Sequence, residues 1–510
     1  MLSATDIANF LSCHHLSTLE RAKALDEIQK PFFHDPGVEL FRELGIRHEA
    51  QYLQHLSSTP GFQIARIPTN IPWIDAVNRT TEAIRSGADV VYQATFQDEP
   101  WGGRSDFLIR VDKPSTLGPF SYEVVETKLA RSAKVRAILQ LCFYSELLSK
   151  IQGALPEWMH VVLGGDTRPE KFPVSHYIAF FRKIKGDFAE ASRTPRSTYP
   201  EPVELCDVCD WFPLCDKRRR NDDHLSLVAG ITKLQRKELG SRDINSVAQL
   251  ASLTLSPVPK FQRIGEAALV RVREQARVQV RGRTEGWMVH ELLEPIEEQR
   301  GLAALPLPSP GDIFLDFEAV PYAFDTGLEY LIGMAFVPEP PGTEPRYEPL
   351  WSFEPNAEKK RFEQFIATVM DRWKRHPDLH IYHYAPYEQS AVKRLAGRHG
   401  TRAEDVDRLL RAGIFVDLYR IVRQALRASV ESYSIKQVEA LYLFARSIAP
   451  RDSLAALQTF EAVLTLGSSE EATRDILETI EAYNRDDCFS ALRLRDWLEE
   501  QRRKVETAKG

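Results

Sequence analysis

The sequence predicts a multidomain α/β protein in which two mixed domains flank a helical middle segment. The chain has 510 residues, more than one hydrophobic core usually supports, so two or three domains are expected. Helical and strand patterns mix through residues 1–223, whereas residues 224–300 show helical patterns alone. The proline-rich stretch LAALPLPSPGD then reads as a linker, and the apolar run IFLDFEAV starts a new strand within residues 301–510.

Composition and charge narrow the function classes. Apolar residues make up 43% of the chain, as in ordinary globular proteins. We find no signal peptide and no apolar run of about 18 residues, so a cytoplasmic location with reduced thiols is expected. The net charge of -6 argues against a uniformly basic nucleic-acid coat but permits local basic grooves. No GxxxxGK[ST] motif is present, so an ATP-driven motor is not indicated.

Two predicted strands of the first domain carry an acid and a Glu-x-Lys pair. Asp106 stands at the start of a strand over 107–111, and the strand SYEVVETKLA follows some fifteen residues later with Glu126 and Lys128. A hairpin would bring the strand ends together, and residues two apart on a strand face the same side. Asp106 and Glu126 could therefore bind a divalent cation, while Lys128 could orient the attacking water or stabilise the charged phosphorane. A solvated strand face is the alternative, because such patterns also occur by chance.

Three further polar residues accompany this pattern. His48, in GIRHEAQYL, is predicted on a helix, where its imidazole could complete a metal shell. Gln140 and Tyr144, in AILQLCFYSELL, lie one helical turn apart after the Glu-x-Lys strand.

Three of the six cysteines lie within ten residues, in ELCDVCDWFPLC. Disulfide pairing would leave one of these three over, whereas zinc and iron-sulfur sites favour four soft ligands. Cys13, in FLSCHHLSTLE, supplies a fourth thiol beside Cys206, Cys209 and Cys215. The spacing leaves both an iron-sulfur cluster and a structural zinc open. The other two cysteines fall within apolar helical patterns and are predicted to be small core residues: Cys142 and Cys488.

The order of these residues resembles the RecB-like branch of the PD-(D/E)xK nucleases, specifically AddB-type and CRISPR-adaptation nucleases that carry a four-cysteine iron-sulfur cluster. The resemblance covers roughly residues 1–220 and implies a restriction-endonuclease-like fold. It implies three ligands of Mg²⁺ or Mn²⁺: His48, Asp106 and Glu126. It implies a catalytic lysine and two residues near the substrate: Lys128, Gln140 and Tyr144. It also implies a 4Fe-4S cluster that joins the two ends of the domain, held by Cys13, Cys206, Cys209 and Cys215.

The middle segment contains a possible nucleic-acid contact. The stretch LVAGITKLQRKELGSRDINSVAQLA looks like a helix-hairpin-helix fragment, whose glycine lets the backbone approach a phosphate. Residues 260–285 hold seven Lys or Arg against three acids. A face that tracks DNA and an ordinary solvated face are both open interpretations.

The third domain carries a second set of acids. In IFLDFEAV, Asp316 and Glu318 alternate with apolar residues, so both carboxylates project from one face of a strand. Two acids on a core strand are costly unless a cation neutralises them. The stretch IEAYNRDDCFSALRLRDWL is predicted to be helical, with Tyr483 and Asp487 four residues apart on one face. Between them, IYHYAPYEQSAVKRL changes from strand to helix and places Glu388 as the remaining acid.

This succession resembles the DEDD exonuclease superfamily, and within it the YprB-like branch, over roughly residues 311–500. The resemblance implies an RNase H-like (DnaQ-like) fold that binds two metals about 4 Å apart. It implies Asp316, Glu318 and Asp487 as ligands and Tyr483 as the residue that orients the water. Glu388 departs from the family pattern, which ends in Phe-Asp after an Asn, and is the least secure ligand.

Three further residues of the third domain bear on this site. Asp486 could replace Asp487 as the ligand, although the spacing from Tyr483 favours Asp487. Asp417 and Lys436 match positions that shape this fold, and we interpret Asp417 as structural first and catalytic second.

The two constellations predict a metal-dependent nuclease with two separate sites. The expected substrate is DNA, single-stranded or with free ends, in repair, recombination or defence, with RNA as the alternative. Relatives of this two-nuclease arrangement are often continued by a superfamily-one helicase, which implies a helicase partner; no membrane partner is expected. The alternative function is a nucleic-acid-binding scaffold subunit with one or both sites inactive. Cleavage polarity and pathway do not follow from these residues.

Overall fold

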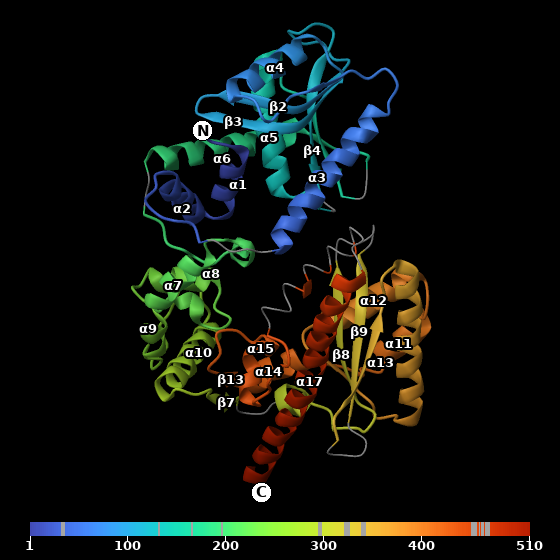
Figure 1. Cartoon of the computed structure of the whole chain (residues 1–510). Helices are drawn as coiled ribbons and strands as arrows, with labels where there is room; N and C mark the ends of the chain where they lie inside the picture. Colours follow the sequence, from blue (N-terminus) through green and yellow to red (C-terminus); the bar gives the residue numbers. More distant parts are fainter. Residues whose placement is uncertain are drawn as a thin grey trace. The chain divides into compact units, whose positions relative to one another are not determined.

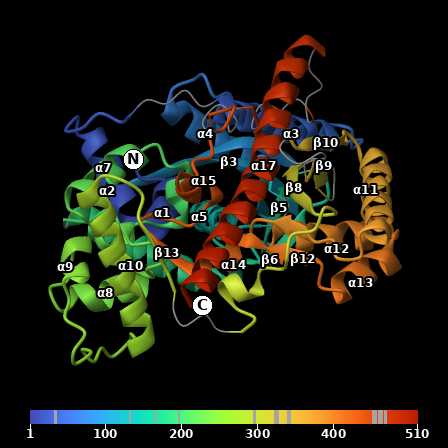
Figure 2. The same cartoon turned by 90° about the horizontal axis from the view of Figure 1, so that it is seen from below.

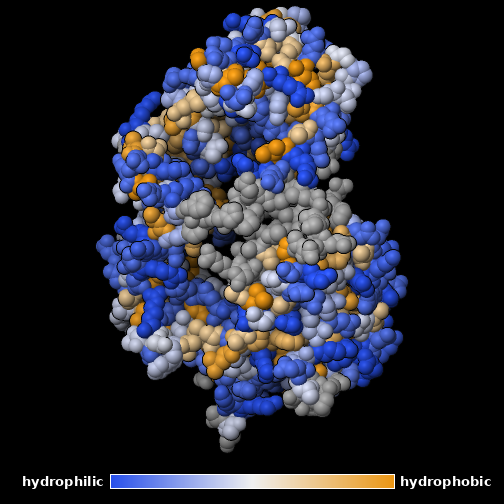
Figure 3. Space-filling view, viewed as in Figure 1, coloured by the Kyte–Doolittle hydropathy of each residue, from blue (hydrophilic) through white to orange (hydrophobic). Residues whose placement is uncertain are grey.

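The chain folds into two compact units, Met1–Asp216 and Lys217–Gly510, in a computed structural model (Figure 1). The structure describes residues 1–31, 36–130, 133–164, 167–194, 197–293, 298–320, 327–337, 343–449, 456–457, 460, 464 and 470–509. Among these residues, no helix combines the length and the apolar character needed to cross a membrane. The described surface seen in Figure 3 is mainly hydrophilic, with small scattered apolar spots.

A mixed sheet of six strands forms the centre of the first unit, in the order β1-β2-β3-β4-β5-β6. The strands are β1 (Ile64–Arg66), β2 (Val90–Asp98), β3 (Trp101–Val111), β4 (Ser121–Lys128), β5 (Trp158–Leu163) and β6 (Glu170–Pro173). β1 runs parallel to β2, and β4 runs parallel to β5, whereas the other neighbours are antiparallel. The predicted hairpin is confirmed, since β3 and β4 pair as antiparallel strands.

Helices cover both faces of this sheet. Along β4, Val124 packs into the larger core and its neighbour Val125 into a second cluster with Tyr52, as the alternation of a strand requires. The helices of the larger core are α1 (Ala4–Ser12), α4 (Trp73–Arg85), α5 (Val135–Gln152) and α6 (Ile178–Arg193). The other face is covered by α3 (Pro36–Ser57). The remaining elements are α2 (His14–Ala24), η1 (Val174–His176), η2 (Glu204–Val208) and α7 (Phe212–Asn221), the last of which runs into the second unit.

A five-stranded sheet organises the second unit, in the order β10-β9-β8-β11-β12. Its strands are β8 (Ile313–Val320), β9 (Leu328–Phe336), β10 (Arg346–Trp351), β11 (Ile381–His383) and β12 (Phe415–Asp417). β8, β9 and β10 are antiparallel neighbours, while β11 runs parallel to both β8 and β12. β8 is the central strand, so its side chains face the helices that pack on the two faces of the sheet.

Alternate residues of β8 enter different cores. Leu315 and Phe317 pack with the helices on one face, whereas Phe314 packs with those on the other. The first group comprises α11 (Pro355–Arg375), α12 (Tyr387–His399) and α13 (Ala403–Arg411). The second comprises α14 (Leu418–Ala425) and the long C-terminal helix α17 (Glu470–Lys509), which lies beside β8 in both views (Figures 1 and 2). Two short elements lie between α14 and α17 on the chain: α15 (Ile435–Val438) and η5 (Glu439–Leu441).

Residues 224–300 belong to the second unit. Their elements are η3 (Leu225–Leu227), α8 (Lys233–Gly240), α9 (Val247–Ala251), α10 (Glu266–Glu285) and β7 (His290–Leu292). They have a hydrophobic core of their own. β7 pairs with β13 (Leu426–Ala428), and Gln275 Nε2 donates to the carbonyl of Ala428 at 2.9 Å. The middle helices are thereby tied to the sheet domain.

The basic stretch of α10 is largely neutralised within the unit. Arg273 and Arg277 pair with Glu274, and Arg277 and Arg281 pair with Glu291. These contacts favour the solvated, ion-paired face over a free DNA-tracking face.

The glycine of the predicted hairpin motif has φ +78. A Cβ at Gly230 would lie 3.2 Å from Arg423 Nη2, so its close neighbour is a guanidinium of the same unit.

The proline-rich stretch before β8 is packed. Leu302, in η4 (Gly301–Ala304), and Leu305 are buried in the core around α14 and α17. Asp312 is fully buried, and its Oδ2 accepts a hydrogen bond from Arg495 Nη1 of α17 at 2.5 Å. The expected linker is therefore part of the second unit.

Candidate active sites

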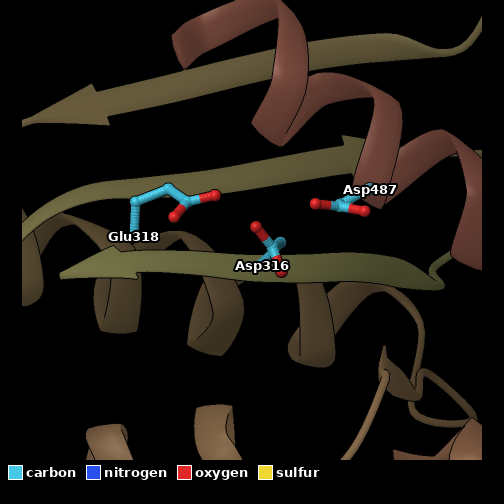
Figure 4. A group of neighbouring side chains, drawn as sticks. All are labelled: Asp316, Glu318 and Asp487. Carbon is cyan, nitrogen blue, oxygen red and sulfur yellow. The ribbon is translucent and has the colours of Figure 1, made fainter. Parts of the chain in front are cut away.

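Three carboxylates converge on the α17 face of the second sheet. Asp316 and Glu318 project from the central strand β8, and Asp487 faces them from α17 (Figure 4). One oxygen of each lies within 4.8 Å of the others. Among the described residues, no other group of three or more His, Cys, Asp or Glu brings its ligand atoms so close. Carboxylate oxygens are the ligands that Mg²⁺ and Mn²⁺ prefer, so this group could hold a divalent cation.

A glycine lets α17 approach the sheet at this point. Gly333 of β9 pairs with Asp316, and a Cβ on it would lie 1.7 Å from Asn484 Oδ1. Asn484 donates to Asp316 Oδ2 at 2.6 Å and accepts from the Tyr347 hydroxyl at 2.8 Å. It also hydrogen-bonds Glu318. Sequence reasoning missed Asn484, although its place between Tyr483 and Asp487 on a predicted helix was available as a signal.

The three carboxylates would repel one another if all were ionised. Burial raises the pKa of Asp316 well above its ordinary value, and the charges of Asp487 and Glu318 raise it further. Burial and Asp487 raise the pKa of Glu318 to about 8, with partial compensation from Lys436. Burial also raises the pKa of Asp487, against the lowering effect of Arg446. The three carboxylates therefore resist full ionisation at neutral pH unless a cation joins them.

Two cationic side chains lie near the ring of Tyr483, beside the acids. Lys436 Nζ is 4.8 Å and Arg446 Cζ is 5.5 Å from the centre of its ring. Burial, then Asp487 and Glu318, raise the pKa of the phenol, so Tyr483 stays protonated and can donate a hydrogen bond. Sequence reasoning missed Arg446, because its contact with Asp487 spans 41 residues of chain.

Glu388 lies near this group but outside it. It is buried at the start of α12, where Glu388 Oε2 is 3.2 Å from His383 Nδ1. Its charge contributes to the raised pKa of Asp316. The structure thus places Glu388 within electrostatic range of the three carboxylates without bringing it into their 4.8 Å group.

The two neighbouring aspartates with alternative roles make structural contacts. Asp417 caps α14: its Oδ1 accepts from the amides of Arg420 at 3.3 Å and Ala385 at 3.0 Å. Asp486 accepts from the amide of Ser447 at 2.7 Å. Asp487, and not Asp486, faces the strand acids.

In the first unit, Asp106, Glu126 and Lys128 come together at the β3–β4 hairpin. Glu126 is fully buried and accepts from Lys128 Nζ at 3.0 Å and from the Asp106 amide at 3.3 Å. Asp106 Oδ2 accepts from the amide and the hydroxyl of Thr127, each at 2.9 Å. Burial and the charge of Asp106 raise the pKa of Glu126 to about 8, which Lys128 partly counteracts.

Two residues that sequence reasoning missed complete this set. Glu49, beside His48 on α3, has its pKa raised by burial and by Asp106. Gln93 Nε2 donates to Glu49 Oε1 at 2.5 Å. Gln93 has φ +59 within β2, a strained conformation of the kind found at functional sites. Glu49 adjoins His48 in GIRHEAQYL, so its position was visible in the sequence although its orientation was not.

The other predicted residues of the first unit have different surroundings. His48 is buried, and its Nε2 donates to the carbonyl of Val162 at 3.1 Å, which leaves Nδ1 as its only possible ligand atom. Tyr144 is buried, hydrogen-bonds Gln140, and has its pKa raised by burial and then by Glu126. In the part of the chain that the structure describes, His48, Asp106 and Glu126 do not form a group within 4.8 Å.

The predicted cysteine ligands gather without forming a tight group. Cys13, Cys209 and Cys215 share a cluster with Trp211, and Cys209 interacts with the charges of Cys206 and Cys13. The six cysteines form no disulfide with one another. No three of the described thiols lie within 4.8 Å of one another, so no compact cysteine cluster is seen. The two cysteines predicted as core residues are indeed fully buried: Cys142 and Cys488.

Comparison with known proteins identifies one region. The model of the RNase_H superfamily matches residues 313–499, which contain β8 and the acid-bearing part of α17. No curated protein matches the chain. Residues 313–499 form an RNase H-like domain, which confirms the expected fold of the C-terminal region.

Proposed function

We propose that the RNase H-like domain is a metal-dependent nuclease that hydrolyses phosphodiester bonds, with Asp316, Glu318 and Asp487 as ligands of Mg²⁺ or Mn²⁺. The convergence of these three carboxylates from β8 and α17 carries the proposal. Carboxylates that lie close together and away from water destabilise the folded chain unless a cation compensates their charge. Their convergence is therefore better explained by metal binding than by a contribution to stability.

The surrounding residues have complementary tasks in this proposal. Bound cations would activate a water and stabilise the charge on the phosphoryl oxygens. Asn484 fixes the orientation of Asp316, and Tyr483 offers a hydroxyl to the attacking water. Glu388 serves as an additional acid beside the group. The resemblance to DEDD exonucleases favours removal of nucleotides from a 3′ end.

The first unit is proposed to carry a second, RecB-like nuclease site. Asp106, Glu126 and Lys128 form its centre, with Glu49 as an added carboxylate. His48 would contribute through Nδ1, and two residues would contact the substrate: Gln140 and Tyr144. What supports this site is a buried glutamate held by a lysine two residues away and facing a second acid.

An iron-sulfur cluster is proposed on the four gathered cysteines, Cys13, Cys206, Cys209 and Cys215. A single zinc ion would need sulfurs about 3.8 Å apart, because each Zn–S bond is about 2.3 Å. In every set of three described thiols, at least one pair of sulfurs is more than 4.8 Å apart, so the four sulfurs do not stand at the spacing of a zinc site. Backbone amides point at two of the sulfurs: Leu16 N at Cys13 and Val203 N at Cys206, each at 3.4 Å.

The proposed substrate is DNA with a free or single-stranded end, and a separate helicase is the proposed partner. A scaffold subunit without activity is the second candidate. It is less well supported, because a decayed site would not need to keep three acids converged on one point.

An end-labelled single strand tests the proposal. The full chain should shorten it from the 3′ end with Mn²⁺ or Mg²⁺ and not with a chelator, and Asp487→Asn should abolish both this activity and Mn²⁺ binding at the site. Asp475→Asn, an exposed carboxylate on the same helix, is the matched control and should cleave normally. Undiminished 3′ shortening by Asp487→Asn would refute the proposed site.

A further inference from the structure

Arg446 is held beside the acidic group by two carboxylates. Its side chain is only 6% exposed. Nη2 donates to Asp487 Oδ1 and to Glu439 Oε1, each at 2.6 Å, and Nε donates to Glu439 Oε2 at 3.0 Å. The guanidinium lies over the ring of Tyr483. The edge of the guanidinium formed by Nε and Nη2 thus donates to carboxylates, which fix its orientation.

The remaining nitrogen of this guanidinium is unpaired. Nη1 of Arg446 is buried and has no hydrogen-bond partner among the described residues. A buried donor without an acceptor costs free energy, and an arginine cannot relieve that cost by losing its proton. The position of Arg446 between Asp487 and Tyr483 therefore calls for an acceptor that arrives from outside the chain.

We infer that Arg446 is a substrate-binding residue of the C-terminal site, and that its Nη1 donates to a non-bridging oxygen of the phosphodiester held at Asp316, Glu318 and Asp487. This inference rests on the proposed function, since the phosphate reaches Arg446 only if the acidic group binds metal and substrate. An anionic phosphate oxygen suits the free arm, because guanidinium groups bind phosphate through short, charge-assisted hydrogen bonds.

Glu439 acts as the positioning residue for this arginine. It is buried, binds two nitrogens of Arg446, and accepts from the hydroxyl of Ser490 on α17 at 2.7 Å. Ser490 is in turn within 2.8 Å of the Tyr442 hydroxyl. This chain of contacts fixes the orientation of the guanidinium.

The test measures binding of a nucleoside 5′-monophosphate to the full chain in Ca²⁺, and KM and kcat for 3′ shortening of a single strand in Mn²⁺. Arg446→Gln and Arg446→Lys should each weaken monophosphate binding roughly tenfold or more, the effect of losing a charged hydrogen bond. Mn²⁺ affinity, measured without nucleotide, should be retained by Arg446→Lys, which keeps the positive charge beside Asp487. Arg411→Gln, which removes an exposed arginine paired with Asp407, is the control and should change none of these values.

The outcomes separate this inference from the proposed function. If the parent chain is active but Arg446→Gln and Arg446→Lys keep its monophosphate affinity and KM, Arg446 does not bind substrate. Loss of Mn²⁺ affinity in Arg446→Lys, with monophosphate binding unchanged, would also overturn the inference and assign Arg446 to holding Asp487. If the parent chain binds no Mn²⁺ at Asp487, the proposed function itself fails. Melting curves of both variants check that the domain is folded, and Arg446→Lys keeps the charge if Arg446→Gln does not fold.

Discussion

Single residues decide whether the acidic group can form. Asp316 and Glu318 reach the same side of β8 because they are two positions apart, but Asp487 reaches them only because β9 has a glycine opposite Asp316. Asn484 then fills the space above Gly333 and fixes the orientation of Asp316. The site thus depends on one missing side chain as much as on the acids.

Gly333→Ala should disrupt this site. Its Cβ would lie 1.7 Å from Asn484 Oδ1, so α17 or Asn484 must move, at a cost of about 1–3 kcal/mol as for other overpacked core positions. Mn²⁺ binding should weaken together with stability, as measured by calorimetry and urea unfolding. Gly397→Ala is the control, because it lies on α12 with no atom within 4 Å of a new Cβ. Equal behaviour of the two variants would contradict the packing argument.

Glu318 should make the stability of the metal-free protein depend on pH. Its pKa is about 8 in the folded chain, against 4.5 ordinarily. Because this pKa is raised, the folded chain keeps the Glu318 proton at pH values where the unfolded chain has lost it. The contribution of protonated Glu318 to the free energy of unfolding is therefore fully present below about pH 4.5 and is lost as pH rises towards 8. Urea unfolding in a chelator should therefore show a larger decline from pH 5 to 8 for the parent chain than for Glu318→Gln. Saturating Mg²⁺ should remove the difference in slope, since it stabilises the ionised carboxylates. Parallel curves in the chelator would show that Glu318 titrates normally.

At the scale of elements, each candidate site joins segments that are distant along the chain. β8 and α17 meet at the acidic group, β3 and β4 meet α3 at the first-unit site, and the ends of the first unit meet at the cysteines. In the last case, Trp211 Nε1 donates to Glu20 Oε1 at 2.8 Å across 191 residues. Short caps such as Asp417 on α14 position the loops around these junctions.

The cysteine junction should contain iron. We expect protein purified without oxygen to be brown, with iron and sulfide bound, and to lose its colour on Cys206→Ser. Cys13→Ser should destabilise the first unit selectively, because the ligands join its two ends. Cys142→Ser is the control for a buried thiol outside the set and should keep the iron. Stoichiometric zinc without iron would contradict the cluster.

At the scale of the whole molecule, the two candidate sites belong to separate compact units with separate cores. The hydrogen bonds that hold the side chains of each candidate site come from residues of the same unit. Their activities should therefore be separable by mutation.

Glu126→Ala should remove one cleavage activity and Asp316→Ala the other. A strand labelled at either end should show two polarities with the parent chain, and Glu126→Ala should keep only shortening from the 3′ end. Glu146→Ala, which changes a glutamate of the same unit paired with Arg182 and Lys185, is the control. Full activity of both site variants at both ends would favour the scaffold function, and loss of 3′ shortening in Glu126→Ala would reverse the assignment of roles.

The sequence alone determined the features that follow from local periodicity. The two-residue alternation of β8 predicted the shared face of Asp316 and Glu318, and the spacing of Tyr483 and Asp487 predicted a helix that presents both. Only the tertiary structure decided which side chains surround these acids. Asn484, Arg446, Glu49 and Gln93 contact residues far away in the chain, and the strand alternation that fixes a face does not specify the neighbour packed against it. The sequence likewise predicted that His48 lies on a helix of the first unit, but it did not predict that His48 Nε2 donates to the backbone carbonyl of Val162. Local patterns follow from backbone geometry, whereas a site also depends on the register and packing between elements that meet only when the chain has folded.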